Sequence, residues 1–313
     1  MLERAPVDCA PTMRLNVLLS SASLLAALQA AQGLSSPPEG AITVGTGGKY
    51  PTLSEALKDT SSNVYFVLAV YGQTSNPQDL SYASNQATIT NNIPASAAGG
   101  NDLSGTVRVL ASDVSIYNLN IANTYGKPVV HSQAIALSVQ AGQFGCYGCG
   151  LTGYQDTLLA HVGTQFYGKS FIQGAVDFIF GMRASVWITD STIDTVAKGY
   201  ITASGRSSDD QGYYVIDKCR ITGKGDQYLG RPWRNYARVI VQETRIASHV
   251  VAAGWSTWSN ARANTDKVLF GEYANTGAGA WKNGRASFAT NLTAAVPILT
   301  VLGNTSWVDG AYL

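Results

Sequence analysis

Two aspartates stand in segments that are otherwise apolar. Asp156 lies in Gly153-Tyr-Gln-Asp156-Thr-Leu-Leu159, and Asp177 lies in Gly174-Ala-Val-Asp177-Phe-Ile-Phe-Gly181. An ionised carboxylate is almost never buried in such a run unless it has a partner. Two neighbouring acids cannot both ionise easily, so one is expected to keep its proton while the other is anionic. Such an arrangement is suited to a general acid working beside a nucleophile.

A basic and an aromatic residue occur further along the chain, in Gly230-Arg231-Pro-Trp233-Arg234. The Arg231 guanidinium can pair with an anionic aspartate, and the Trp233 ring can pack on a sugar ring. In the alternative interpretation Arg231 only neutralises a buried acid and Trp233 is core packing. Two acids together with the adjacent Gln155 favour a functional site.

Other kinds of chemistry lack their motifs. Ser207 and Ser256 each follow a glycine by two residues, but neither is followed by the closing glycine of a nucleophile elbow. The stretch 45–50 lacks the Ser or Thr after lysine and the final glycine of the phosphate-binding motifs. Three scattered histidines do not make a zinc cluster. Serine-triad, nucleotide and zinc mechanisms are therefore excluded.

The composition excludes several classes of protein. The 21 basic and 20 acidic residues give a net charge of +1, so no field attracts nucleic acid or an acidic membrane. Charged residues are only 13% and glycines number 32, which is unlike a helical bundle. With 45% hydrophobic residues the chain can bury a core, so it is not disordered.

Short strand-like segments recur along the chain. They close on an aliphatic residue at Ile121, Leu151, Ile172, Ile193, Ile221 and Ile246. The successive spacings of 30, 21, 21, 28 and 25 residues leave no room for crossover helices, so the strands are expected to stack as a solenoid. A β-sandwich is disfavoured because few hairpin turn signals occur. The sequence predicts an all-β parallel β-helix.

This repeat also places the two acids. Asp156 and Asp177 are 21 residues apart, the same interval as between Leu151 and Ile172. They are therefore expected on adjacent turns at the same angular position, about 4.8 Å apart.

Three flanking elements are expected outside the solenoid. Thr52-x-x-Glu55 is a capping box ahead of a short helix through Leu57, and Ile42–Val44 resembles a short strand. Beyond Gly254 the repeat fades, which predicts a C-terminal tail that packs back on the coil.

The N-terminus has the pattern of a secretory signal. Residues 13–34 combine a basic start, an apolar run and small residues, and no stop-transfer cluster follows as a membrane anchor would require. We interpret Met13 as the start, 1–12 as a spurious extension, 13–34 as a signal peptide and 35–313 as one secreted domain. No other stretch approaches a transmembrane length. The sequons at Asn291 and Asn304 are consistent with export as a glycoprotein.

Removal of the leader would leave three cysteines, Cys146, Cys149 and Cys219. An odd number cannot form a complete disulfide framework. Residues three apart on a strand point to opposite faces, so Cys146 and Cys149 are predicted to be buried free thiols.

Four segments resemble motifs of the pectin methylesterase family. They are Gln133-Ala-Ile-Ala-Leu137, Gly153-Tyr-Gln-Asp-Thr-Leu158, Gly174-Ala-Val-Asp-Phe-Ile-Phe-Gly181 and Leu229-Gly-Arg-Pro-Trp233. Tyr117-Asn-Leu-Asn-Ile-Ala-Asn-Thr124 is similar to the fungal branch. The resemblance runs from about Ile42 to the C-terminus. It implies a right-handed parallel β-helix that removes methyl esters from homogalacturonan, as a carboxylic ester hydrolase without metal or other cofactor.

The resemblance also implies a role for each matched acid. Asp177 would be the nucleophile that attacks the C6 methyl-ester carbonyl, with Arg231 keeping it ionised. Asp156 would protonate the departing methanol and then deprotonate the water that hydrolyses the acyl-enzyme.

The remaining matched residues would handle the oxyanion and the sugar. Gln133 and Gln155 would donate hydrogen bonds to the oxyanion. Trp233 and Phe180 would line a groove for pectin, the expected partner of a monomeric enzyme that binds neither nucleic acid nor membrane.

Two departures from the family pattern bear on function. Ser132 stands where many members have histidine, and His131 lies one residue earlier. Between Leu57 and Tyr71 only Lys58–Val70 spans a gap in which roughly twenty residues are missing relative to the family's turns. A β-helix that binds pectin without cleaving it is therefore the alternative function. A pectate lyase is a weaker rival, because no acidic cluster for Ca²⁺ accompanies the two acids.

Overall fold

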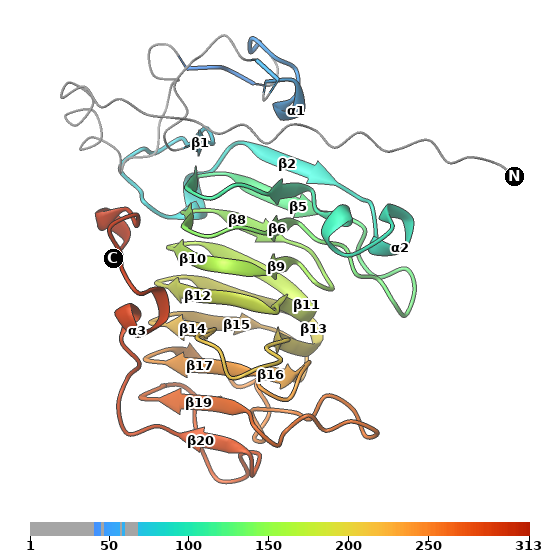
Figure 1. The fold of residues 1–313 in the computed structure, drawn as a ribbon, viewed down its shortest axis with the longest axis vertical. Coiled ribbons are helices and arrows are strands. Elements are labelled where there is room, and N and C mark those ends of the chain that lie inside the picture. Colours follow the sequence, from blue (N-terminus) through green and yellow to red (C-terminus); the bar gives the residue numbers. More distant parts are fainter. Residues whose placement is uncertain (1–40, 45–46, 57, 60–67) are drawn as a thin grey trace, which may run out of the picture. The chain divides into compact units, whose positions relative to one another are not determined.

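A computed structural model describes residues 41–44, 47–56, 58–59 and 68–313. The segments predicted as the leader and its extension, 13–34 and 1–12, lie outside the described residues. From residue 68 onward the chain winds as a coil of short parallel strands (Figure 1). The prediction of an all-β parallel β-helix is thus confirmed.

The strands form three faces of the coil. One face is a nine-stranded sheet of β1 (Leu68–Tyr71), β4 (Val114–Tyr117), β7 (Phe144–Tyr147), β10 (Val162–Gly168), β12 (Arg183–Thr189), β14 (Tyr214–Asp217), β17 (Arg238–Gln242), β19 (Leu269–Tyr273) and β20 (Ala289–Asn291). The second face holds β2 (Thr88–Asn91), β5 (Asn120–Asn123), β8 (Gly150–Thr152), β15 (Arg220–Gly223), β18 (Arg245–Ile246) and the first halves of β11 (Phe171–Gly181) and β13 (Thr192–Ser204). The third face holds β3 (Val107–Val109), β6 (Leu137–Val139), β9 (Leu158–Ala160), β16 (Gln227–Pro232) and the second halves of β11 and β13. The long strands β11 and β13 therefore connect the second face to the third.

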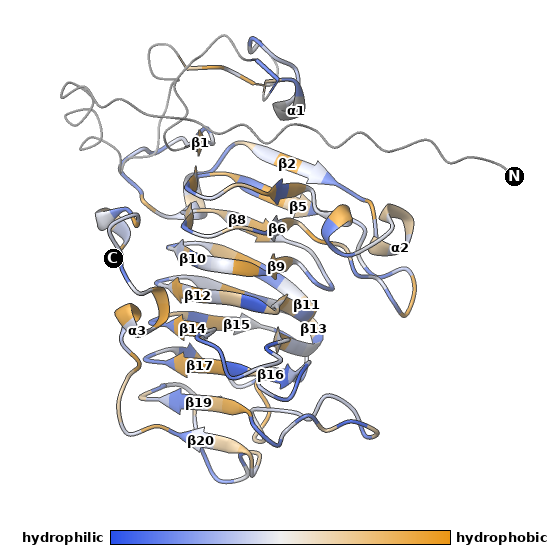
Figure 2. Cartoon of the chain, in the orientation of Figure 1, coloured by the Kyte–Doolittle hydropathy of each residue, from blue (hydrophilic) through white to orange (hydrophobic). Residues whose placement is uncertain are grey.

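The aliphatic repeat seen in the sequence forms a ladder inside the coil. Each of its six residues pairs in register with the next, from Ile121 with Leu151 through to Ile221 with Ile246. All six are at most 1% exposed and belong to the main core cluster. Figure 2 shows hydrophobic segments recurring in the stacked strands. Burial of these aliphatic side chains stabilises the stacking of the turns. It also favours a single register, because a shift by one residue would move them out of the core.

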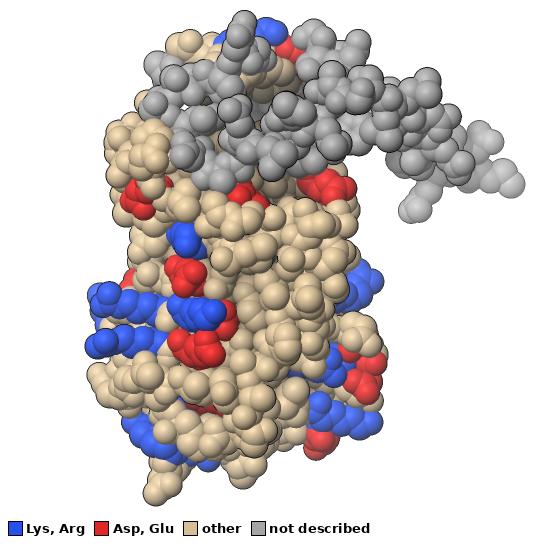
Figure 3. Space-filling view, turned by 90° about the vertical axis from the view of Figure 1, so that its left-hand side faces the viewer, with Lys and Arg blue, Asp and Glu red and all other residues tan. Residues whose placement is uncertain are grey.

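A second ladder marks the bend between the first and second faces. Asn118, Lys169, Asp190, Lys218 and Glu243 all have φ of 48°, a left-handed conformation that turns the chain sharply. Their stacking brings opposite charges together, with Lys169 Nζ 3.8 Å from Asp190 and Lys218 Nζ 4.0 Å from Glu243. Figure 3 shows basic and acidic side chains alternating along one side of the molecule. These pairs are exposed, so each contributes little to stability.

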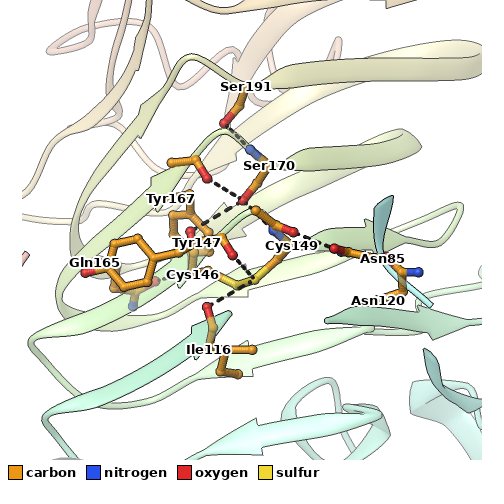
Figure 4. The surroundings of a disulfide bond; sticks show 12 residues. Asn85, Ile116, Asn120, Cys146, Tyr147, Cys149, Gln165, Tyr167, Ser170 and Ser191 are labelled. Atoms are coloured by element: carbon orange, nitrogen blue, oxygen red, sulfur yellow. Dashed lines mark hydrogen bonds between the residues drawn. A yellow bond between two sulfur atoms is a disulfide. The ribbon is translucent and has the colours of Figure 1, made fainter. Parts of the chain in front are cut away.

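The prediction of free thiols at Cys146 and Cys149 is wrong, because the two residues form a disulfide (Figure 4). The strand geometry assumed for them does not hold. Gly148 between them has φ of 60° and belongs to the bend, so the alternation of side chains is broken and both cysteines point into the core. Cys219 is a buried free thiol as predicted.

The elements before the coil agree in part with expectation. Thr52 Oγ1 accepts from the Glu55 N–H at the start of α1 (Leu53–Ala56), as the capping box predicts. No strand forms at 42–44, where Val44 makes only an isolated bridge to Tyr50. Much of the shortened segment lies outside the described residues, but its end supplies β1, which pairs with β4.

The C-terminal prediction needs correction, because the coil continues past Gly254. Strands β19 and β20 extend the nine-stranded sheet to Asn291. Only then does the chain turn back, through α3 (Ile298–Leu302) and the 3₁₀ helix η4 (Gly310–Tyr312). Tyr312 is fully buried among Tyr117, Tyr147 and other rings on the outside of the nine-stranded sheet. The tail therefore packs on the coil, as expected, but begins later.

Two short helical elements on the third face complete the fold. These are α2 (Ala95–Ala98) and the 3₁₀ helix η3 (Asp102–Ser104), and η2 (Tyr82–Ser84) lies in an earlier loop. The N–H of Ala95 donates to Gln133 O at 2.8 Å, and the N–H of Thr106 donates to Ile135 O at 3.0 Å. This segment is thus anchored to the residues that precede β6.

Candidate active site

The strand register places the two acids on adjacent turns. Gln155 forms parallel bridges to Gln133 on one side and to Val176 on the other. The Asp156 N–H donates to Val176 O at 3.0 Å. Asp156 and Asp177 therefore lie next to each other on neighbouring turns, separated by the 21-residue interval that the repeat predicted.

A β-bulge shapes the strand at this point. From Val176 to Ile179 the strand β11 advances by three residues, whereas its partner β13 advances by only two, from Tyr200 to Thr202. Phe178 and Ile179 both enter the core, which shows that side-chain alternation is interrupted here. Asp177 has φ of 50° and Asp156 has φ of 66°. Bulges and left-handed residues of this kind commonly re-aim side chains at functional sites.

Arg231 on β16 holds Asp177 with two hydrogen bonds. Its Nε donates to Oδ1 at 2.8 Å and its Nη2 to Oδ2 at 2.6 Å, a fork that matches the carboxylate. The guanidinium itself lies between two rings, with its Cζ 4.0 Å from the centroid of Tyr200 and 4.3 Å from that of Trp258. Arg231 is thereby fixed in position, and its charge is directed at Asp177.

The two carboxyls differ in their electrostatic surroundings. Burial, and next the charge of Asp177, raise the pKa of Asp156 well above its usual value of 3.8. Burial also raises the pKa of Asp177, but the hydrogen bonds and charge of Arg231 oppose that rise. Arg231 thus favours the ionised form of Asp177, whereas burial and the charge of Asp177 favour the protonated form of Asp156.

Gln155 is oriented by the backbone of a neighbouring turn. The Ser132 N–H donates to Gln155 Oε1 at 3.0 Å. This fixes the carbonyl end of the amide and leaves its N–H groups without an acceptor among the described residues. Gln133 lies beside it in the adjacent turn, half-buried. Ser132 is fully buried and His131 exposed, so the departure from the family pattern leaves the Gln155 support in place.

Aromatic and apolar side chains cover the outer surface of the third face. Phe180 and Leu159 form a cluster against which Trp233 and Trp258 pack. The ring centroids of Phe180 and Trp233 are 6.2 Å apart. This is the surface that the sequence assigned to a sugar groove through Trp233 and Phe180.

Sequence reasoning missed several residues of this site. Trp258 and Tyr200 flank Arg231, and the Asn101 Nδ2 donates to Asp156 Oδ2 at 3.2 Å. Trp258 was not predicted because it lies beyond Gly254, where the sequence repeat is no longer recognisable. Tyr200 was not predicted because it lies on β13, outside the four family motifs. The Gly99-Gly100 pair before Asn101 is a sequence signal for a turn, and both residues have positive φ, 87° and 155°.

Two surface depressions lie away from the acids. One of about 420 Å³ is lined by Tyr82, Asn85, Phe171 and neighbours on the second face. Another of about 270 Å³ lies beside Arg220 and Arg245, further along the same face. The chemistry of the acids, rather than the size of a depression, marks the candidate site.

Comparison with known proteins identifies the family. A family model described as Pectinesterase matches residues 80–296, a range that contains every residue of the candidate site. The chain belongs to the pectinesterase family. Members of this family are carboxylic ester hydrolases, and so is this chain.

Individual pectinesterases are similar over most of their length. The pectinesterase of Aspergillus aculeatus is 43% identical over 334 aligned positions, which cover 95% of this chain and 99% of the relative. The pectin methylesterase structure from Aspergillus niger has a TM-score of 0.79 at 38% identity, covering 90% of this chain and 100% of that one. The carrot pectin methylesterase has a TM-score of 0.74 at 28% identity, covering 87% and 96%. The first alignment is longer than the 313 residues of this chain, so that relative has residues that this pectinesterase lacks.

Proposed function

We propose that this pectinesterase hydrolyses the C6 methyl esters of homogalacturonan through an aspartyl acyl-enzyme, releasing methanol and pectate. The observation that carries the proposal is the pair of unlike carboxyls, with Asp177 held by both nitrogens of the Arg231 fork and Asp156 buried beside it. An ionised and a protonated acid side by side supply the nucleophile and the proton donor that ester cleavage needs.

The first half-reaction forms the acyl-enzyme. An Asp177 oxygen attacks the ester carbonyl carbon, and the carbonyl electron pair moves onto its oxygen. The N–H groups of Gln155 and Gln133 donate to this oxyanion. When the intermediate collapses, the methoxy group takes the Asp156 proton and leaves as methanol.

The second half-reaction returns the enzyme to its starting state. Asp156, now a carboxylate, removes a proton from water as the water oxygen attacks the acyl carbon. The bond to Asp177 breaks, Asp177 regains its charge, and the sugar leaves as a carboxylic acid that ionises in solution. Asp156 ends protonated, so both carboxyls are ready for another turnover.

Trp233 and Phe180 are the residues proposed to contact the sugar. Trp233 is half-buried, and its ring offers a flat apolar surface of the kind on which sugar rings pack. Phe180 is only 3% exposed and packs against the Trp233 ring. Neither residue reaches the acids by a hydrogen bond, so their contribution belongs to binding. Pectin is accordingly the proposed partner.

Methanol release from citrus pectin by the purified protein tests the proposal. Catalysis is expected, since the acids, glutamines and arginine that it requires are all present in one place. Tight binding of pectin with no methanol released would instead support the alternative, a pectin-binding protein impaired by the shortened 58–70 segment.

Gln155→Ala is expected to lower kcat by about 10²- to 10³-fold, the usual loss for one oxyanion donor. The Ser132 N–H would lose its acceptor at the same time. Gln173→Ala is a matched control, because Gln173 also lies on this part of the coil but donates to Asp194 on the second face. Methanol release at saturating pectin measures both. A loss of less than about threefold for Gln155→Ala would contradict its role.

Chelators are expected to leave activity unchanged. Within the described ranges, no three residues among His, Cys, Asp and Glu are grouped to hold a metal ion. Methanol release should be compared before and after dialysis against EDTA. Loss of methanol release that Ca²⁺ restores would contradict this prediction, whereas Ca²⁺-dependent cleavage of the pectin chain without methanol release would favour the lyase interpretation.

We also propose that the protein is secreted and glycosylated. The A. niger pectin methylesterase carries an N-acetylglucosamine stub on an asparagine. In this chain the sequon residues Asn291 and Asn304 are exposed, as glycan attachment requires. That the protein acts as a monomer stays a prediction.

The described part of the chain has no helix that is long and apolar enough to span a membrane.

A further inference from the structure

Asn101 makes the one hydrogen bond that the described residues offer to the Asp156 carboxyl. Its Nδ2 donates to Asp156 Oδ2 at 3.2 Å. The remaining oxygen, Oδ1, has no donor among the described residues. The two oxygens of the proposed general acid are therefore not equivalent.

The backbone around Asn101 is held by contacts that do not involve Asp156. Gly99 ends α2 with φ of 87°, which brings Asn101 to the start of η3. The Asn101 carbonyl accepts from the Ser104 hydroxyl at 2.7 Å, and that hydroxyl accepts from the Ile135 N–H at 3.3 Å. Asp102, the next residue, accepts from Arg108, Ser138 and Gln140. Asn101 is thus presented to Asp156 by an anchored segment.

We propose that Asn101 is a positioning residue for Asp156, fixing Oδ2 as an acceptor so that the proton is carried on Oδ1 and is given to the leaving methanol from there. This inference rests on the proposed function of Asp156 as acid and base. The Asn101 N–H can only donate a hydrogen bond. If Oδ2 of Asp156 carried the carboxylic proton, two donors would therefore face each other. The proton is left on the oxygen that faces no protein donor.

The same hydrogen bond also acts after the proton has gone. A donor stabilises the carboxylate form more than the protonated form, so Asn101 eases proton release to methanol. The charged groups that face Asp156 are Asp177 and Arg231, and Arg231 is engaged by Asp177. Asp102 is neutralised by Arg108. Within the segment 99–104, Asn101 is therefore the residue whose side chain contacts the Asp156 carboxyl, and it does so as a neutral donor.

Asn101→Ala and the similarly shaped Asn101→Leu test this role. Both should lower kcat/KM for methanol release by about 10- to 100-fold, the range for a lost hydrogen bond to a charged group. KM should change little. Without the donor the pKa of Asp156 rises further, so the alkaline limb of the kcat/KM profile should move to higher pH even as the maximum falls.

Arg108→Ala is the control for a purely structural effect. It loosens the same segment through Asp102 but leaves the Asn101 amide in place, so it should lower Tm without moving the alkaline limb. A wild-type pH profile with kcat/KM within about twofold in both Asn101 variants would overturn the proposal. So would a loss of activity that Arg108→Ala reproduces without a shift of the limb, or unfolding of both Asn101 variants where the wild type stays folded. Absence of methanol release by the wild type would instead overturn the proposed function.

Discussion

Asp177→Asn is expected to reduce methanol release to background, a loss of roughly 10⁴-fold or more, as for removal of nucleophiles in other enzymes. The amide fills the same volume but cannot attack the ester carbonyl. Its carbonyl oxygen can still accept from Arg231, while its N–H₂ would meet the second guanidinium donor. The measurement is methanol release from pectin over hours, with the fold checked by circular dichroism.

Asp194→Asn is the matched control for this substitution. Asp194 lies on β13, which pairs with β11, but its carboxyl accepts from Gln173 on the second face. It should keep wild-type activity. Turnover by Asp177→Asn within about tenfold of the wild type would refute the acyl-enzyme mechanism.

Asp156→Asn is expected to lower kcat by about 10²- to 10⁴-fold, the range for a positioned general acid and base. The wild type should lose activity as the pH rises through the raised pKa of Asp156, since the acid must be protonated in the free enzyme. This alkaline limb should be absent from the residual activity of the variant. A limb that persists unchanged would assign the titration to another group.

The same substitution should affect stability with a definite sign. The pKa of Asp156 in the folded protein lies above its unfolded value of 3.8, so the folded protein binds this proton more tightly than the unfolded chain does. The stabilisation is fully present below the unfolded value and is lost as the pH rises through the folded value. Asp156→Asn should therefore raise Tm relative to the wild type more at about pH 7 than at about pH 4. Equal Tm differences at both values would contradict the raised pKa.

The spacing of the repeated aliphatic residues was enough to predict the β-helix and the placement of Asp156 and Asp177 on adjacent turns. Stacked turns of a solenoid pair in register, so residues separated by one repeat become neighbours whatever lies between them. Leu151 with Ile172 and Gln155 with Val176 both keep the interval of 21 residues. The bulge at Asp177 does not disturb this, because the preceding turn follows the same path.

The disulfide was not predictable in this way. The prediction for Cys146 and Cys149 assumed an extended strand, in which residues three apart diverge. One left-handed residue, Gly148, reverses that geometry. A glycine is compatible with many conformations, so its presence in the sequence does not reveal which one the chain adopts.

By itself the sequence determined the repeat, the core ladder and the placement of the two acids on adjacent turns, and it predicted Gln155 and Arg231 as their partners. Only the tertiary structure provided a physical reason for the two acids to differ, because the Arg231 fork opposes the rise in the pKa of Asp177 and burial raises the pKa of Asp156. It also brought Asn101 to Asp156 and Trp258 to Arg231, across 55 and 27 residues. Asn101 and Trp258 lie outside the strands, and their contacts follow no repeat interval, so no spacing in the chain could indicate them.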